Sequence, residues 1–170
     1  MTIEQLRNEV EEKINAIEYN WQDTNNNIRI MLDIRENVDN IPAIPSAKHI
    51  AEVAVSCNDY LQMRDFLMGL PTEKPREKVI TYLTIINDAV GIENAVPTLT
   101  ILSSFMYELD KPESARSLLN IALEANPDYS LANLLNRVYN AEWPSRMLTD
   151  MSADLHPKVV KTIETGVPHL

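Results

Sequence analysis

Glycine is scarce in this sequence, whose 170 residues contain three glycines and ten prolines. An average chain carries about 7% glycine, and tight hairpins, β-bulges and phosphate-binding loops use this residue to reach positive φ. The shortage therefore argues against an all-β fold. Gly69, Gly91 and Gly166 are also too far apart to form a Walker A loop or a dinucleotide-binding fingerprint.

Cysteine and long apolar runs are also nearly absent. Because Cys57 is the only cysteine, no intrachain disulfide can form, which is typical of proteins from a reducing compartment. No stretch approaches the roughly 18 consecutive apolar residues that indicate a membrane span. The first residues form a charged amphipathic pattern and lack the apolar core of a signal peptide. We therefore expect a cytoplasmic protein that does not contact membranes.

The chain has no basic patch either. It carries 15 basic and 25 acidic side chains, a net charge of -10. The densest basic stretch, around Lys74, Arg76 and Lys78, is interleaved with glutamates. The field of such a molecule repels phosphate backbones, so we expect no direct binding of nucleic acid. Residues 1–43 hold nine acidic and four basic side chains, half of the net charge, so no acidic patch is predicted either.

Apolar residues recur at helical spacing from the start of the chain. Thr2 with Gln5 has the form of a capping box, and an acidic face lies opposite an apolar stripe, which predicts an amphipathic helix that covers an apolar surface. The near-heptad spacing of the stripe also raises the hypothesis of a homo-oligomer formed through this helix. The stripe consists of Ile3, Leu6, Val10, Ile14, Ile17 and Trp21.

The next segment, residues 28–38, fits both a strand and a helix. We favour a helix because a lone strand would have no partner. The proline-bearing residues 40–45 are the only convincing linker. The sequence therefore predicts an N-terminal helical segment with its linker at 1–45 and a helical domain at 46–170, which together form a single globular unit.

Prolines mark the helix junctions in the second part of the chain. Ser46 is predicted to cap one helix, and a second begins at Asn58 or Asp59 and is closed by Gly69 as a C-cap. Proline ends one helix and is tolerated in the first turn of the next, so we expect an all-α fold of stacked antiparallel helix pairs. The remaining helices are expected at 76–90, 97–109, 112–125, 129–141, 144–152 and 157–165.

The helix pair from Leu99 to Pro127 resembles the tetratricopeptide pattern. Small residues at Ala115 and Ala122 would let the second helix lie close to the first. No second copy lies one repeat length away, so the resemblance implies a tetratricopeptide-like pair inside a helical domain. Its groove-facing side would present Thr100, Ser104, Tyr107 and Glu108.

A broader similarity covers residues 46–150. Its most specific part is the block at 122–135, with a proline-acid-tyrosine turn at 127–129, followed later by Trp143-Pro-Ser. These residues resemble the C-terminal half of the domain of unknown function family numbered 4192, found in actinobacteria and their phages. The family's Gly-Asp turn appears here as Leu109-Asp110, and the resemblance does not extend to its N-terminal half. The family has no established activity, so the resemblance implies fold and lineage only, and a short version suits a phage-encoded protein.

Few residues suggest metal binding or catalysis. His49 and Glu52 lie three apart, a spacing that lets both reach one ion, but no further ligands accompany them and no metal is expected. Cys57 is interpreted as a buried thiol and not as a nucleophile, and Arg64-Asp65 as an internal ion pair. No carboxylate pair is marked out for acid–base work. We therefore predict no catalytic residue and no cofactor.

The sequence is best interpreted as a non-enzymatic adaptor or regulatory protein, a helical protein-interaction module with a protein partner. One alternative hypothesis is an acidic inhibitor or nucleic-acid mimic that acts on a host protein. A second, less favoured alternative is a metal-dependent enzyme. Met147 and Met151, four residues apart near Trp143 in a short tail helix, are expected to form an exposed apolar strip. The candidate partner-binding residues are therefore Thr100, Ser104, Tyr107, Glu108, Trp143 and Met147.

Overall fold

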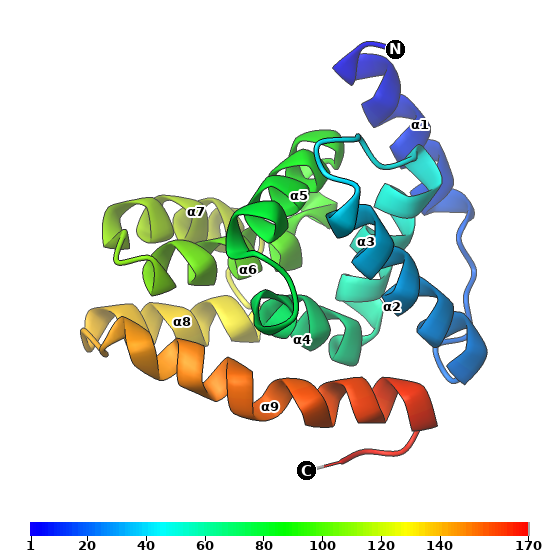
Figure 1. The fold of residues 1–170 in the computed structure, drawn as a ribbon. Coiled ribbons are helices and arrows are strands. Elements are labelled where there is room, and N and C mark those ends of the chain that lie inside the picture. The colour runs from blue at the N-terminus through cyan, green and yellow to red at the C-terminus, as the bar shows by residue number, and fades with distance from the viewer. Residues whose placement is uncertain (170) are drawn as a thin grey trace.

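The computed structural model describes residues 1–169 of the chain. Within these residues all regular secondary structure is helical, as predicted (Figure 1). Two short 3-10 turns, η1 (Leu70–Thr72) and η2 (Ile92–Asn94), join longer helices. The α-helices are α1 (Ile3–Ala16), α2 (Thr24–Asp39), α3 (Ala47–Asp59), α4 (Leu61–Gly69), α5 (Arg76–Ala89), α6 (Val96–Glu108), α7 (Pro112–Ala125), α8 (Ser130–Asn140) and α9 (Ser145–Thr165).

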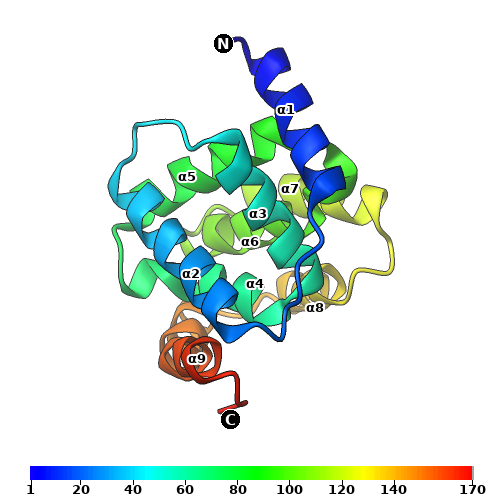
Figure 2. The ribbon, with the colours of Figure 1, turned by 90° about the vertical axis from the view of Figure 1, so that its right-hand side faces the viewer.

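Helix α6 lies at the centre of the molecule (Figure 2). It packs against α3, α4, α5, α7, α8 and α9, and eleven of its 13 residues are buried. Its buried hydroxyl groups all find acceptors. Within α6, Thr100 donates to the carbonyl of Val96 at 2.7 Å and Ser104 to that of Ile101 at 2.6 Å. Ser103 instead donates to the carbonyl of Ala115 in α7, and Thr98 to the side chain of Asn87 in α5. Hydroxyls satisfied in this way can lie in an apolar core without an unpaired polar group.

The first helix covers the core as expected, but it is shorter than its apolar stripe predicted. The capping box at Thr2 and Gln5 is present, and Leu6 and Val10 are buried where α1 packs on α3 and α5. The helix ends at Ala16, and Trp21 instead stacks on Tyr60, with ring centroids 6.2 Å apart. The stripe that raised the hypothesis of self-association therefore lies largely against the chain's own helices.

Residues 24–39 form a helix, as we favoured for the ambiguous segment. Asp23 caps α2, and the buried face of the helix packs on α5 and α9. Ile34 of α2 belongs to the same core cluster as Leu6 of α1 and Ile163 of α9. Residues 1–45 therefore pack on the rest of the chain.

Helix α4 departs from the prediction at both ends. It begins at Leu61, after Tyr60 and not at Asn58 or Asp59. Gly69 does not act as a left-handed C-cap, since its φ is -90° and the chain continues directly into η1. A Cβ at Gly69 would lie 2.8 Å from Cγ of His156. The glycine is thus required by the close approach of α9 to α4.

Prolines predicted most helix boundaries correctly but failed at Pro157. Helices α5 to α8 begin and end within one residue of the predicted positions. In contrast, Pro157 lies inside α9, a single helix where two were predicted. Proline removes the hydrogen bond to the carbonyl of Ala153, but both residues are exposed, so water can bond that carbonyl. Gly166, with φ 71°, ends the helix as a left-handed C-cap.

Candidate partner-binding groove

The structure buries four of the six predicted partner-binding residues. Thr100 and Ser104 are inaccessible inside α6, and the ring of Tyr107 stacks on Tyr139 of α8 with centroids 4.4 Å apart. The Tyr107 hydroxyl donates to the carbonyl of Trp143. The tetratricopeptide-like surface expected along this side of α6 is therefore not accessible, because α8, α9 and their connection cover it.

Glu108 is also enclosed. Its side chain is 3% exposed, and its carboxylate accepts hydrogen bonds from Arg76 of α5 at 2.6 Å and from Thr149 of α9 at 3.2 Å. The residue joins three helices and does not face a partner. Its role in this structure is to hold the start of α9 against α5 and α6.

The other two predicted residues, Trp143 and Met147, are exposed as expected. They belong to a group of large apolar side chains on α8, α9 and their connection that remains in contact with solvent. The exposed fractions are 47% for Leu134, 38% for Trp143, 41% for Met147, 47% for Met151 and 52% for Leu155. Contiguous exposed apolar side chains on a folded chain commonly mark an interaction site.

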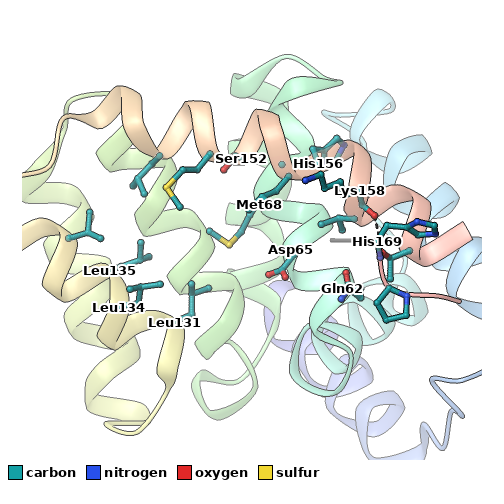
Figure 3. Close-up of a pocket in the computed structure, with 18 of the residues that line it drawn as sticks. Gln62, Asp65, Met68, Leu131, Leu134, Leu135, Ser152, His156, Lys158 and His169 are labelled. Carbon is teal, nitrogen blue, oxygen red and sulfur yellow. Dashed lines mark hydrogen bonds between the residues drawn. The ribbon is translucent and has the colours of Figure 1, made fainter. Parts of the chain in front are cut away.

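All of these side chains except Met147 line a groove with a volume of about 440 Å³ between α4, α8 and α9, which we call the α4–α8–α9 groove (Figure 3). Met68 of α4 lies between its two walls. The wall from α8 comprises Leu131, Leu134, Leu135 and Val138. The wall from α9 comprises Leu148, Met151, Ser152, Leu155, Val159 and Thr162. Both walls follow the spacing of one face of a helix.

The groove exists because α8 and α9, although consecutive, share only α6 among the helices on which they pack. α8 packs on α6 and α7, whereas α9 packs on α2, α4 and α6. At the α4 contact, the ring of His156 lies over Gly69 and bonds Glu73 through Nε2 at 2.6 Å. Because α9 is fixed in this way, its apolar side lines a groove instead of being buried against α8.

The polarity of the groove changes along its length. Leucines of α8 lie at one end, and Gln62, Asp65, Lys158 and His169 lie at the other (Figure 3). The C-terminal segment closes the polar end, because the backbone N–H of His169 donates to Thr162 Oγ1 at 3.0 Å. An occupant therefore meets apolar side chains along the helices and polar groups only at one end.

The residues considered for metal binding face different partners. Nε2 of His49 lies 2.7 Å from the Tyr82 hydroxyl, and burial lowers the pKa of His49 to about 4. The Glu52 carboxylate instead accepts hydrogen bonds from Arg29 and Tyr19. Burial raises the pKa of Glu52, but these hydrogen bonds outweigh it and leave the pKa below its usual value. Across residues 1–169 no group of three or more histidine, cysteine or carboxylate side chains is arranged to hold a metal ion.

The remaining chemical candidates are structural. Cys57 is buried, and burial raises the pKa of its thiol to about 12, so no thiolate is available at neutral pH. Arg64 and Asp65 form the ion pair that their adjacency predicted, at 2.8 Å. Asp65 also lines the polar end of the groove.

The groove could not be predicted from the sequence, because the apolar stripes of α8 and α9 that form its walls have the same spacing as core-facing stripes. Leu134 belongs to the same apolar stripe of α8 as Leu135, yet Leu135 is buried and Leu134 is half exposed. Leucine or valine at 131, 134, 135 and 138 forms an apolar stripe of ordinary width. The sequence therefore does not distinguish a groove wall from a core contact at these positions.

No helix in the part of the chain that the structure describes is both long and apolar enough to cross a membrane. Searches of curated proteins and of solved structures found no match. A family model, described as a domain of unknown function (DUF4192), matches residues 3–145. The match thus includes α1 and α2, which the similarity seen in the sequence left out, and it stops at the first residue of α9. With most of its length matched, the chain belongs to the DUF4192 family.

Proposed function

We propose that this protein is a non-enzymatic interaction module that binds the apolar face of a helix in the α4–α8–α9 groove. The observation that carries the proposal is the set of large apolar side chains, among them Leu134, Met151 and Leu155, that the fold leaves exposed on both sides of one groove. Isolated exposed leucines are ordinary, but a rimmed and contiguous group is not.

The length of the groove fits a helix. The α9 wall runs from Leu148 to Thr162, which at 1.5 Å per residue is about 20 Å, or nearly four helical turns. Two apolar walls of this length match an occupant that presents apolar side chains at positions i, i+3, i+4 and i+7. Such an occupant would contact α8 with one edge of its apolar face and α9 with the other.

Two methionines give the groove an adaptable lining. Met68 lies between the walls and Met151 belongs to the α9 wall. The unbranched thioether side chain adopts several shapes at low cost, which suits a surface that accommodates apolar side chains of different size. The groove chemistry therefore favours an apolar helical face over a single rigid small molecule.

The proposal is tested by selecting a displayed library of amphipathic helical peptides for binding to the purified protein. Enriched peptides should carry apolar residues at helical spacing and lose binding to the Leu134→Asp variant, which places a charge on the α8 wall. The matched control is Ile121→Asp on α7, since Ile121 is 39% exposed and does not line the groove. Peptides without an apolar face, or binding that Leu134→Asp leaves intact, would contradict the proposed function.

A further inference from the structure

We infer that the helix bound in the α4–α8–α9 groove is α9 of a second copy of this chain, so that the protein is a symmetric dimer. This inference rests on the proposed function, because it names the partner of the same groove. In such a dimer each copy offers both the groove and the helix that fills the groove of the other, as a two-fold interface requires.

Helix α9 itself carries the exposed apolar ridge that the groove needs. Met147, Met151 and Leu155 are each about half exposed and follow one another at intervals of four residues. No other helix within residues 1–169 presents three exposed large apolar side chains at such spacing. The exposed apolar residues outside α8, α9 and their connection are Met1, Ile3, Leu32, Ile44, Leu61, Ile92, Leu109, Ile121 and Val167.

An antiparallel pairing of the two α9 helices aligns their apolar residues. When Leu155 lies on the two-fold axis, it faces Leu155 of the second copy, and Met151 faces Val159 of the second copy. All three of these residues line the groove. The same register brings Trp143 towards the C-terminal end of the second copy's α9, next to exposed Val167. The pairing therefore covers the apolar side chains along the whole α9 wall.

The charges on the flank of α9 complement one another in the same register. Two acidic residues, Asp150 and Asp154, are followed one helical turn apart by the basic Lys158 and Lys161, and all four are exposed. In an antiparallel pair, Asp154 approaches Lys158 of the second copy, and Asp150 approaches Lys161. A parallel pair in register would place like charges together, which costs stability.

Local neutrality permits this association despite the charge of the whole chain. α9 carries three basic and three acidic side chains, whereas the full chain has a net charge of -10. Two such chains repel each other over most of their surfaces. The neutral α9 is an element through which they can approach. Within residues 1–169, Asp154, Lys158 and Lys161 also form no intrachain ion pair, so they are available to the second copy.

The first test is sedimentation velocity over a range of micromolar concentrations of the full chain. The wild type should sediment as a dimer at the upper concentrations. Leu155→Asp, which places two charges face to face on the axis, should sediment as a monomer, and the control Ile121→Asp should remain dimeric. Far-UV circular dichroism checks that both variants fold. A wild type that is monomeric throughout, or a dimer that Leu155→Asp leaves intact, would overturn the inference.

The second test concerns the register. Asp154→Lys and Lys158→Asp each replace two attractive contacts between copies by repulsion, and each should weaken self-association about tenfold. An equimolar mixture of the two variants should recover association, because a heterodimer restores opposite charges at both contacts. Failure of the mixture to associate better than either variant alone would overturn the antiparallel pairing.

The outcomes separate this inference from the proposed function. A monomeric chain that still binds displayed helical peptides through Leu134 would refute the second copy as occupant and leave the groove as a site for the helix of another protein. A monomeric chain that binds no helical peptide would refute both. Displacement of selected peptides as the chain concentration rises would support both, because the peptides and α9 would compete for one groove.

Discussion

At the scale of single residues, close approach and burial decide which roles the glycine and histidine residues take. Gly69 allows the ring of His156 to lie against α4, and that contact fixes the position of the α9 wall. His49 resembled a metal ligand in the sequence, but it is buried and bonded to Tyr82. Neither role could be predicted from the sequence, because each depends on a residue that lies far away along the chain.

Gly69→Ala should destabilise the protein by about 1–3 kcal/mol, because the added methyl group overlaps the buried ring of His156 and forces α9 away from α4. Urea unfolding measures the change. Gly91→Ala is the matched control. Its Cβ would meet only the flexible carboxylate of Glu93 at 2.7 Å, so its effect should stay within about 0.5 kcal/mol. Equal stability of the Gly69→Ala variant and the wild type would contradict the close packing.

His49 should make stability depend on pH. Its pKa is about 4 in the folded chain because burial disfavours the charged form, whereas an unfolded chain has a histidine pKa of about 6.5. As the pH falls, His49 therefore takes up a proton in the unfolded state before it does so in the folded state. The stability is complete above about pH 6.5 and falls as the pH drops towards 4, by up to about 1.4 kcal/mol per pH unit. Urea unfolding of His49→Gln should show a shallower dependence across this window, and an unchanged slope would contradict the assignment.

At the scale of helices, the sequence predicted where most helices begin and end but not which helices pack against each other. Prolines located α5 to α8 because proline acts locally on the backbone. The burial of Thr100 and Ser104 could not be predicted from the sequence, because it results from the packing of six other helices around α6. The exposure of Trp143 and Met147 was predicted correctly. The segment around Pro144 carries more large apolar side chains than a short helix can bury against one neighbour.

Pro157→Ala should stabilise the protein by about 1–3 kcal/mol, because alanine restores the hydrogen bond to the Ala153 carbonyl inside α9 and removes the crowding by the proline ring. Thermal and urea unfolding both report the gain. Pro112→Ala, at the first position of α7, is the control and should bring no gain, since proline is favoured there. A loss of stability in Pro157→Ala would show that the proline stabilises α9.

At the scale of the whole molecule, the N-terminal helices and the remainder form one body. Leu6, Ile34 and Ile163 share a core, although the prolines at 42 and 45 predict a linker at residues 40–45. The sequence could not show this packing, because an amphipathic helix looks the same whether it covers its own chain or another. The net charge of -10 likewise identified no partner, because the acidic residues do not gather at the groove.

The chain should therefore unfold as one cooperative unit. Trp21 reports on the N-terminal segment and Trp143 on the groove, and they are the two tryptophans of the sequence. In the single-tryptophan variants Trp21→Phe and Trp143→Phe, the fluorescence transition in urea should coincide with the loss of helical circular dichroism. A Trp21→Phe or Trp143→Phe chain in which the two probes give separate midpoints would show that residues 1–45 unfold on their own.

The most direct test of helix docking in the groove is the emission of Trp143. A Trp21→Phe chain at low concentration is titrated with a tryptophan-free chain, in which both tryptophans are replaced by phenylalanine, so that only Trp143 at the groove is observed. Docking of the second chain's α9 should shift the emission to shorter wavelength in a saturable manner, and a titrant that also carries Leu155→Asp should leave it unchanged. An emission maximum that never moves, or that moves equally with the Leu155→Asp titrant, would contradict docking of α9 in the α4–α8–α9 groove.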